Sequence, residues 1–486
     1  MVQESTQGRT SKLHAIVIPL PLQGHVIPAV HLATKLASNG FTVTFVNTHY
    51  IHHQISSSSS AASSSDDIFD GSGLDIRYET ITDGFPLGFD RSLNHDQFFE
   101  GILHVFPAHV EELLQRLAAA QEDQRLRLMI ADTFFVWPSA LASKYGMLYA
   151  SFWTEPALVL TLYFHLDLLK LHGHFGCQKN REDSIDYIPG VKRINPKDVM
   201  SYLQPTCNDT NTICHRIIYR AFADAKRADF IVINTVHGLE PEIITALNKA
   251  QPTYPIGPIF PPGFTKGPVS TSLWPESDCS TWLAAQPDRS VLYVSFGSYA
   301  HTSKEVIHAM AHGLLRSSAR FIWAIRPDIV SSDDPNPLPD GFEERARGKG
   351  MVVTWCSQRE VLMDRAVGGF LTHCGWNSVL ESVWCGVPLL CYPLYTDQFT
   401  NRKLVVDDWS VGINLCDGDC VTGDEVARNI DRLMMGESAD ELRVHVEKMR
   451  KIIEDALADG GSSQGYFDKF VEDAKVKVDK IYGLGC

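Results

Sequence analysis

The chain has 486 residues, 44% of them hydrophobic, which allows about two to four domains with packed cores and excludes a disordered chain. Its 43 basic and 58 acidic residues give a net charge of −15 without any Lys/Arg block, so nucleic acid is not an expected partner and any bound phosphate must be held mainly by local dipoles. Eleven cysteines without a paired C-x-x-C framework, a polar N-terminus and no uninterrupted apolar span predict a cytoplasmic protein without structural disulfide, zinc or membrane span.

The first elements in chain order are a strand, a helix and a second strand. His14 to Leu20 form an apolar run, and Pro21 to Gly24 form a turn. A helical period follows through Ala37 and stops at Gly40, and Phe41 to Val46 are again strand-like. The pattern predicts one strand-helix-strand unit.

Composition then marks a loop and a linker. Ser56 to Ser65 are polar and of low complexity, which predicts a flexible surface loop. A later apolar run, Leu126 to Ala131, ends at Asp132, and Pro, Gly, Ser and Thr dominate between Pro252 and Pro275. We therefore place an N-terminal domain at residues 1–253, a linker at 254–278 and a C-terminal domain at 279–486, and we expect the final helix to pack back on the N-terminal domain.

Strand-like runs alternate with helical patterns after the linker. They are Val291 to Phe296, Arg320 to Ile325, Met351 to Thr354, Gly369 to Thr372 and Pro388 to Tyr392. Such alternation predicts a parallel sheet with helices on both faces. The simplest architecture is α/β, with two similar halves that meet across a cleft, and ligands of such sheets lie beyond the carboxyl ends of the strands.

The densest group of chemically useful residues lies where a predicted strand leads through Gly375 into a helix. A helix start offers unpaired N–H groups and about half a positive charge, so it can hold a diphosphate without Lys or Arg. His373, Asn377 and Ser378 add side-chain donors, and Glu381 on the same helix face can accept hydrogen bonds from sugar hydroxyls. The alternative is that Asn377 and Ser378 only cap the helix and that Glu381 is a surface charge.

The segment from Trp355 to Gln398 gives these residues a context. Its 44 residues resemble the donor-binding signature of plant family-1 UDP-dependent glycosyltransferases, which have the GT-B fold of two Rossmann-like parallel-sheet domains facing across a cleft. Two positions depart from the signature, because Ser357 stands where the family usually has Pro and Asp364 where it often has His. Neither position carries chemistry in the family, so only local packing is affected.

The resemblance implies a role for each donor-side residue, with UDP-glucose as the expected donor because the signature closes with Gln398 rather than His. A flat aromatic side chain suits a flat base, so Trp355 would stack on uracil beside the Cys356 backbone. Asp397 and Gln398 would bind the hexose. The other implied donor-binding residues are Gln358 and Glu381 at the ribose, Ser298, His373, Gly375, Trp376, Asn377 and Ser378 at the diphosphate, and Thr154 and Tyr395.

His25 is the candidate general base. It follows Gly24 in the turn after the first strand and precedes the helix that includes Pro28, so the helix start favours the neutral imidazole that a base requires. From the residue alone, a solvated histidine or a cap is the more frequent interpretation. In the family that the chain resembles, the His after a Gly at this place is the catalytic base, which implies the same role for His25.

Asp132 matches the aspartate that, in the family, holds the base histidine and balances its charge after proton uptake. The pair is similar to the histidine-carboxylate half of a hydrolase triad. The alternative is that Asp132 caps a helix over 133–142. The implied reaction is a direct displacement with inversion that forms a β-glucoside and needs no covalent intermediate, metal or other cofactor. Asp417-Gly418-Asp419 has the D-x-D spacing of some metal sites, but this composition is typical of a turn.

The expected acceptor is a small lipophilic plant metabolite with a hydroxyl or carboxyl group. Two other classes remain open: a non-catalytic UDP-sugar or metabolite-binding protein, and a GT-B-fold sugar-nucleotide epimerase. Aromatic side chains are the main acceptor candidates, although such residues are more often core. The candidate acceptor residues are Gly24, Phe85, Phe89, Phe134, Trp137 and Thr396, with Phe152 and Tyr163 as further aromatic candidates.

Overall fold

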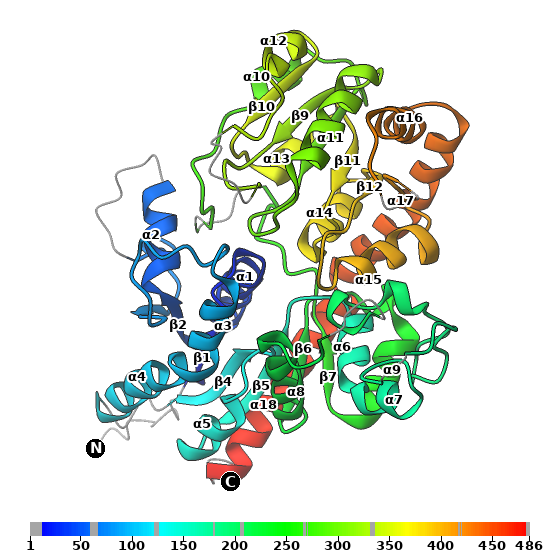
Figure 1. Ribbon diagram of the computed structural model, residues 1–486. Helices are drawn as coiled ribbons and strands as arrows, with labels where there is room; N and C mark the ends of the chain where they lie inside the picture. The colour runs from blue at the N-terminus through cyan, green and yellow to red at the C-terminus, as the bar shows by residue number, and fades with distance from the viewer. Residues whose placement is uncertain are drawn as a thin grey trace.

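The computed structural model describes residues 12–58, 67–120, 126–177, 180–204, 209–265, 269, 271–330, 336–416, 418 and 420–482. These residues form two α/β halves, one above the other in Figure 1, and the strands of each half pair in parallel. The predicted α/β class with two parallel sheets is confirmed.

The N-terminal half is built around a seven-stranded sheet. Its strands are β1 (His14–Ile18), β2 (Thr42–Thr48), β3 (Ile76–Ile81), β4 (Leu126–Asp132), β5 (Leu148–Trp153), β6 (Phe230–Ile233) and β7 (Thr253–Pro255), in the order β3-β2-β1-β4-β5-β6-β7. Its helices are α1 (Gln23–Ser38), α2 (His49–Ser58), α3 (His95–His104), α4 (Phe106–Ala120), α5 (Pro138–Lys144), α6 (Ala157–Phe164), α7 (Leu166–Leu171), α8 (Ile213–Ala225) and α9 (Pro241–Ala250), with short 3-10 turns η2 (Pro196–Asp198), η3 (Ser201–Leu203) and η4 (His237–Leu239).

Both faces of this sheet are buried, which explains why its inner strands are continuous apolar runs. Side chains alternate between the faces along a strand. In β1, Ile16 and Ile18 pack into the hydrophobic cluster covered by α3, α4 and α8, whereas Ala15 and Val17 pack into the cluster covered by α1. The register of β1 between β2 and β4 is thereby fixed, and with it the position of the loop that follows β1.

The C-terminal half is built around a six-stranded sheet. Its strands are β8 (Val291–Ser295), β9 (Arg320–Ala324), β10 (Gly350–Val353), β11 (Val367–Thr372), β12 (Leu389–Cys391) and β13 (Gly412–Asn414), in the order β10-β9-β8-β11-β12-β13. The remaining helices are α10 (Ser280–Ala284), α11 (Lys304–Arg316), α12 (Phe342–Ala346), α13 (Gln358–Met363), α14 (Trp376–Trp384), α15 (Gln398–Lys403), the π-helical turn η5 (Leu404–Asp408), α16 (Gly423–Met434), α17 (Gly436–Leu457) and α18 (Ser462–Tyr482).

The last helix, α18, packs on the N-terminal half, where Figure 1 shows it running beside the lower sheet. Phe467 and Phe470 of α18 are fully buried in the cluster on the α1 side of that sheet. The Tyr254 hydroxyl at β7 donates to Asp473 at 2.6 Å, and the Ser463 hydroxyl donates to the Gly257 carbonyl at 2.5 Å. Helix α18 therefore joins the end of the chain to the segment that leaves the first sheet.

Two predicted details differ from the structure. Ser56 to Ser58 belong to the last turn of α2, because Ile55 of that helix is buried and extends the helix past the start of the serine run; residues 59–66, which include the rest of the predicted loop, lie outside the described residues. Strand β13 is absent from the predicted elements, since its three residues, Gly412–Asn414, include only one large apolar side chain and show no strand period. No helix in the described part of the chain is long and apolar enough to cross a bilayer.

Candidate active site

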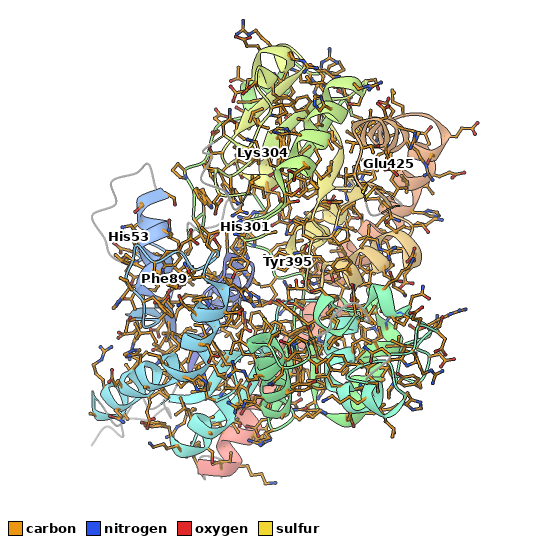
Figure 2. All side chains as sticks on the ribbon, in the orientation of Figure 1. His53, Phe89, His301, Lys304, Tyr395 and Glu425 are labelled. Atoms are coloured by element: carbon orange, nitrogen blue, oxygen red, sulfur yellow. The ribbon has the colours of Figure 1, made fainter. Side chains whose placement is uncertain are left out.

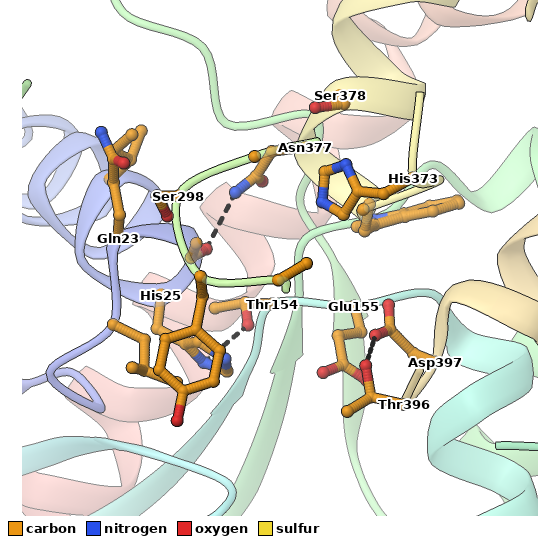
Figure 3. A pocket seen from close by; sticks show the side chains of 18 of the residues that line it. Gln23, His25, Thr154, Glu155, Ser298, His373, Asn377, Ser378, Thr396 and Asp397 are labelled. Atoms are coloured by element: carbon orange, nitrogen blue, oxygen red, sulfur yellow. Dashed lines mark hydrogen bonds between the residues drawn. The ribbon is translucent and has the colours of Figure 1, made fainter. Parts of the chain in front are cut away.

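A cavity of about 330 Å³ lies between the two halves at the carboxyl ends of both sheets. His25 after β1 and Thr154 after β5 line it from the N-terminal half. Ser298 after β8, Trp355 after β10 and His373 after β11 line it from the C-terminal half (Figure 3). This volume falls at the lower end of the range of small-molecule sites, so the predicted ligand position beyond the strand ends coincides with a real cavity.

His25 is held by two side chains from neighbouring strands. Its Nδ1 lies 2.7 Å from Oδ2 of Asp132 and 3.0 Å from the Thr154 hydroxyl. A carboxylate can only accept, so Nδ1 donates and the lone pair of Nε2 is left for a substrate proton. Helix α1 begins at Gln23, so His25 lies within its first turn and not ahead of the helix as predicted, because Val26 N–H already bonds back to the Leu22 carbonyl.

Asp132 is fixed on its other side as well. Its Oδ1 accepts a hydrogen bond from the Phe134 backbone N–H at 3.0 Å, and its side chain is only 1% exposed. The Phe134 ring in turn meets the His25 ring edge-on, with centroids 5.8 Å apart. The alternative role of Asp132 as a cap of a helix over 133–142 is wrong, because the next helix, α5, begins only at Pro138. Asp132 instead orders the turn that carries Phe134.

The start of α14 faces this pair from the C-terminal half. Gly375 is the residue before the helix, and a Cβ there would lie 2.6 Å from the His373 ring. A Cβ on Gly297, which has a φ of +69°, would lie 2.7 Å from the same Nε2–Cε1 edge of that ring. The two glycines thus admit the imidazole of His373 between two loops, which is a more direct reason for glycine at 375 than the predicted approach of a ligand to the backbone.

His373 presents a neutral nitrogen beside the helix start. Burial, followed by the charge of Arg326, lowers the pKa of His373 to about 4, although a hydrogen bond with the Ser295 backbone opposes the shift. The imidazole is therefore uncharged at neutral pH. Its Nδ1 is buried without a hydrogen-bond partner among the described residues, which leaves it available to a ligand in the cavity.

Arg326 holds the loop that carries Ser298. This arginine is 2% exposed, and its guanidinium donates to the Ser298 carbonyl at 2.9 Å and also to the Ala300 carbonyl. Asp328 lies 3.1 Å from the guanidinium and offsets part of its charge. The Ser298 loop and the His373 ring are thus backed by one buried cation, which adds positive potential at the place where the diphosphate is predicted to bind.

The predicted base and ribose residues lie together at the far end of the cavity. The Gln358 amide, at the first residue of α13, donates to Glu381 at 2.7 Å and to the Ser378 hydroxyl at 3.1 Å. Burial raises the pKa of Glu381 above its ordinary value, with Arg359 and Gln358 opposing the shift. Trp355 lines the same end, whereas the Cys356 side chain is directed into the core at 2% exposure, so only its backbone suits the predicted position.

Two residues at the start of α14 bond across to the N-terminal half. The Asn377 amide donates to the Gly24 carbonyl at 2.8 Å, next to His25. The Trp376 indole donates to the Asn234 carbonyl at 2.7 Å and is buried. The predicted contact of Trp376 with the diphosphate therefore cannot involve its side chain, because the indole N–H already bonds to the other half. Only the backbone N–H of Trp376 remains for an anion.

Replacing Trp376 with phenylalanine should lower the thermal stability of the protein. The change removes the donor to the buried Asn234 carbonyl, and an unsatisfied buried acceptor costs about 1–3 kcal/mol. Scanning calorimetry should show a lower unfolding temperature than for the wild type. Trp282→Phe, at a half-buried tryptophan of α10, is the control and should shift the transition less. Equal shifts in the two variants would contradict a bonding role for the indole.

The predicted hexose residues form a closed hydrogen-bonded group after β12. Gln398 accepts through Oε1 from the backbone N–H groups of Leu394 at 2.9 Å and Tyr395 at 3.2 Å, which leaves its amide N–H₂ for a ligand. Asp397 accepts from the Thr396 hydroxyl at 2.7 Å and from Asn401 at 2.5 Å. Burial raises the pKa of Asp397, although these hydrogen bonds oppose the shift. Thr396, predicted to contact the acceptor, lines the cavity, but its hydroxyl is already bonded to Asp397.

The predicted acceptor aromatics are only partly correct. Phe134 and Tyr163 line the cavity. Phe85 stacks on Phe89 with centroids 4.4 Å apart, outside the cavity lining, and Figure 2 shows Phe89 on the outer side of the N-terminal half. Trp137 packs on Phe135 and Phe106, and Phe152 is 1% exposed on the α1 side of the sheet. Trp137 and Phe152 are therefore core, whereas Phe85 and Phe89 are partly buried against the edge of the core and do not line the cavity.

Sequence reasoning missed a large part of the cavity wall. It consists of His95 and Phe99 of α3, Tyr202, Cys214, Ile217 and Ile218 of or near α8, and Tyr299. The amphipathic period of α8 was the available signal, since Ile217 and Ile218 fall on one helix face with Cys214. Nothing in a single sequence, however, shows that this face meets a cavity.

Glu155 is a further cavity residue that the predicted site did not include. It directly follows Thr154, and its Oε2 is buried without a hydrogen-bond partner among the described residues. The available signal was a glutamate inside an otherwise apolar stretch. Separately, the described residues contain no group of three or more His, Cys, Asp or Glu side chains placed to hold a metal ion, and Asp417 and Asp419 lie outside them.

Comparisons with known proteins agree with this geometry. A family model described as "UDP-glucoronosyl and UDP-glucosyl transferase" matches residues 128–442. The chain is 57% identical to UDP-glycosyltransferase 86A1 of Arabidopsis thaliana over 479 residues, which cover 97% of this chain and 96% of that protein. The structure of Phytolacca americana UGT2 complexed with UDP-2fluoro-glucose and pterostilbene is similar with a TM-score of 0.77 at 26% identity, covering 95% of this chain and 100% of the other. A UDP-glucosyltransferase from Polygonum tinctorium, described as capable of glucosylating indoxyl, gives a TM-score of 0.77 at 28% identity, covering 96% and 99%.

Proposed function

The chain belongs to the UDP-glycosyltransferase family, and from that premise we propose that it transfers glucose from UDP-glucose, with inversion, to a hydroxyl or carboxyl group of a small lipophilic plant metabolite. The observation that carries the proposal is the pairing of His25 with Asp132 at 2.7 Å in the same cavity as the start of α14. A base and an anion-binding helix start then lie on opposite walls of one cavity.

The proposed reaction is a single displacement at the anomeric carbon. As the acceptor oxygen forms its bond to that carbon, His25 takes the acceptor proton on Nε2, and the Asp132 carboxylate stabilises the imidazolium that results. The bond between the anomeric carbon and the diphosphate oxygen breaks, and UDP keeps its electron pair. Attack opposite an α-linked leaving group gives a β-glucoside.

The leaving UDP is stabilised by neutral donors and dipoles. The N–H groups at the start of α14 and the neutral imidazole of His373 face the position where the charge develops. Arg326 adds positive potential from behind the Ser298 loop. These groups supply the electrostatic stabilisation that the step needs, so we propose that the transfer requires no metal or other cofactor.

Two parts of the cavity support the proposed donor and the proposed acceptor. Asp397 and Gln398 offer acceptor and donor groups to hexose hydroxyls, and the similar Phytolacca protein was solved with an analogue of UDP-glucose. The wall made by Phe99, Ile217 and Ile218 suits an apolar, flat acceptor. The similar Polygonum protein is described as glucosylating indoxyl, which belongs to that chemical class.

The test is UDP release from UDP-glucose over a panel of lipophilic phenols, alcohols and carboxylic acids, with and without a chelator. We expect acceptor-dependent UDP release that a chelator leaves unchanged, and a product whose anomeric proton coupling in NMR is that of a β-glucoside. Nucleotide binding without turnover of any acceptor would favour a binding protein. Conversion of UDP-glucose without an acceptor would favour an epimerase, and either result would overturn the proposal.

A further inference from the structure

Glu155 places a carboxyl group at the hexose end of the cavity. It stands between Thr154, which contacts His25, and the short segment before α6. Figure 3 shows its side chain beside Thr396 and Asp397, which come from the C-terminal half. Two carboxyl groups, one from each half, therefore meet at the place where the transferred sugar is proposed to lie.

The bonding of Glu155 is incomplete, in contrast to that of a buried glutamate nearby. Glu240 accepts from the backbone N–H groups of Ala157 at 3.0 Å and Leu158 at 2.8 Å, and from the Thr235 hydroxyl at 2.6 Å. Glu240 thereby caps α6, and its role is structural. Glu155 is half-buried and lines the cavity, and its Oε2 atom is buried without a partner among the described residues. A buried polar atom without a hydrogen-bond partner lowers the stability of the folded protein. Such an atom in a cavity wall therefore indicates a ligand that supplies the missing hydrogen bond.

The two facing carboxyl groups differ in how they are stabilised. Burial, followed by the negative charges of Asp397 and Asp132, raises the pKa of Glu155 well above its ordinary value. Asp397 has the Thr396 hydroxyl and the Asn401 amide to stabilise its anion. Protonation is therefore favoured more at Glu155, which as a neutral carboxyl offers an O–H donor, whereas Asp397 offers acceptor oxygens. A sugar hydroxyl both donates and accepts, so the pair matches it.

We propose that Glu155 binds the transferred sugar, donating its O–H to a hydroxyl of the hexose beside Asp397, and that the pair selects an uncharged hexose over a hexuronic acid. The inference rests on the proposed function for the identity of the donor. A hexuronic acid would bring a second negative charge against the Asp397 carboxylate in a buried site, where like charges repel strongly. The sugar then lies between the two halves and is bound by residues from both of them.

The test compares UDP-glucose with UDP for binding, because the ratio of their affinities isolates the sugar. In Glu155→Ala this ratio should fall by about tenfold, the effect of losing a hydrogen bond of about 1.4 kcal/mol, while the affinity for UDP itself stays unchanged. Glu155→Gln has a side chain of the same length that still carries a neutral donor and an acceptor. Its ratio of UDP-glucose to UDP affinity should therefore stay close to that of the wild type. Calorimetric titration with each nucleotide gives both numbers without requiring turnover.

Selectivity is the second readout. The preference of kcat/KM for UDP-glucose over UDP-glucuronate should fall by about tenfold in Glu155→Ala, because only the neutral sugar loses a bond. Glu242→Ala, at an exposed glutamate of α9 that pairs with Lys192, is the matched control and should leave the ratios unchanged.

An unchanged affinity ratio in Glu155→Ala would overturn the inference, as would a change confined to the KM of the acceptor. If Glu155→Ala does not bind UDP, the affinities are measured on Glu155→Asp instead. Aspartate is one methylene shorter, so Glu155→Asp should lower the ratio of the UDP-glucose affinity to the UDP affinity by a similar factor. Absence of glucose transfer by the wild type would overturn the proposed function alone, because the binding ratio is measured without transfer.

Discussion

Replacing His25 with alanine should lower kcat for glucose transfer by about 100- to 10,000-fold, while the affinity for UDP changes by less than about threefold. The imidazole is the group on the N-terminal wall whose Nδ1 is bound to Asp132 and whose Nε2 is left for the acceptor proton. The proposed nucleotide contacts lie on the C-terminal wall, so the loss is expected in the chemical step and not in nucleotide binding.

Single-turnover measurements at saturating UDP-glucose separate the chemical step from product release. His53→Ala is the matched control, because His53 is an exposed histidine of α2 on the outside of the N-terminal half (Figure 2), and it should keep the wild-type rate. A His25→Ala variant that retains more than about a tenth of the wild-type kcat would remove His25 from the role of base.

Asp132→Asn should give the second largest loss, about 100-fold or more in kcat. In the proposed reaction the carboxylate stabilises the imidazolium that forms during transfer, and its 2.7 Å contact with Nδ1 fixes the proton of the resting imidazole on that nitrogen. An amide carries no charge, and its N–H₂ can face Nδ1, which would shift the imidazole proton to Nε2 and block proton uptake. Nitrogen NMR of the histidine ring in the variant would detect that change of tautomer.

The two substitutions should not be additive. Once His25 is absent, Asp132 has no imidazolium to stabilise, so the double variant His25→Ala/Asp132→Asn should be no slower than His25→Ala alone within about threefold. Asp70→Asn, at an exposed aspartate, serves as the control for removal of a carboxylate and should keep the wild-type rate. Losses that multiply in the double variant would show that Asp132 acts independently of His25.

The fold was predictable where its pattern is local. The strand-helix-strand unit at the N-terminus and the strands near 291, 320, 351, 369 and 388 follow from apolar runs that both faces of a parallel sheet require. Strand β13 was not predicted, because its three residues include a single large apolar side chain, whereas β12, equally short, lies within the longer apolar run from Pro388 to Tyr392. The end of α2 was misjudged because a serine run by itself carries no information on the buried face of the preceding helix.

The donor side of the cavity was predictable because its residues belong to one long sequence signature. The segment from Trp355 to Gln398 resembles a known donor site, and its residues do lie around one cavity. The pairing of His25 with Asp132 spans 107 positions in the chain, so no local pattern contains it and only the family resemblance implied it. The directions of the side chains were predicted least well. The Trp376 indole bonds to the other half, Trp137 points into the core, and Phe85 and Phe89 pack against the edge of the core outside the cavity.

The hydrogen bond between Ser463 and Gly257 also affects how the two halves are connected. The chain leaves the N-terminal half after β7 and comes back to it at the start of α18, and this bond holds the two passages side by side. Two adjacent passages of the chain restrict the twisting of one half against the other more than a single passage would. Removal of α18 would leave only the passage after β7 as a covalent connection held to the N-terminal half, without altering one residue of the cavity wall.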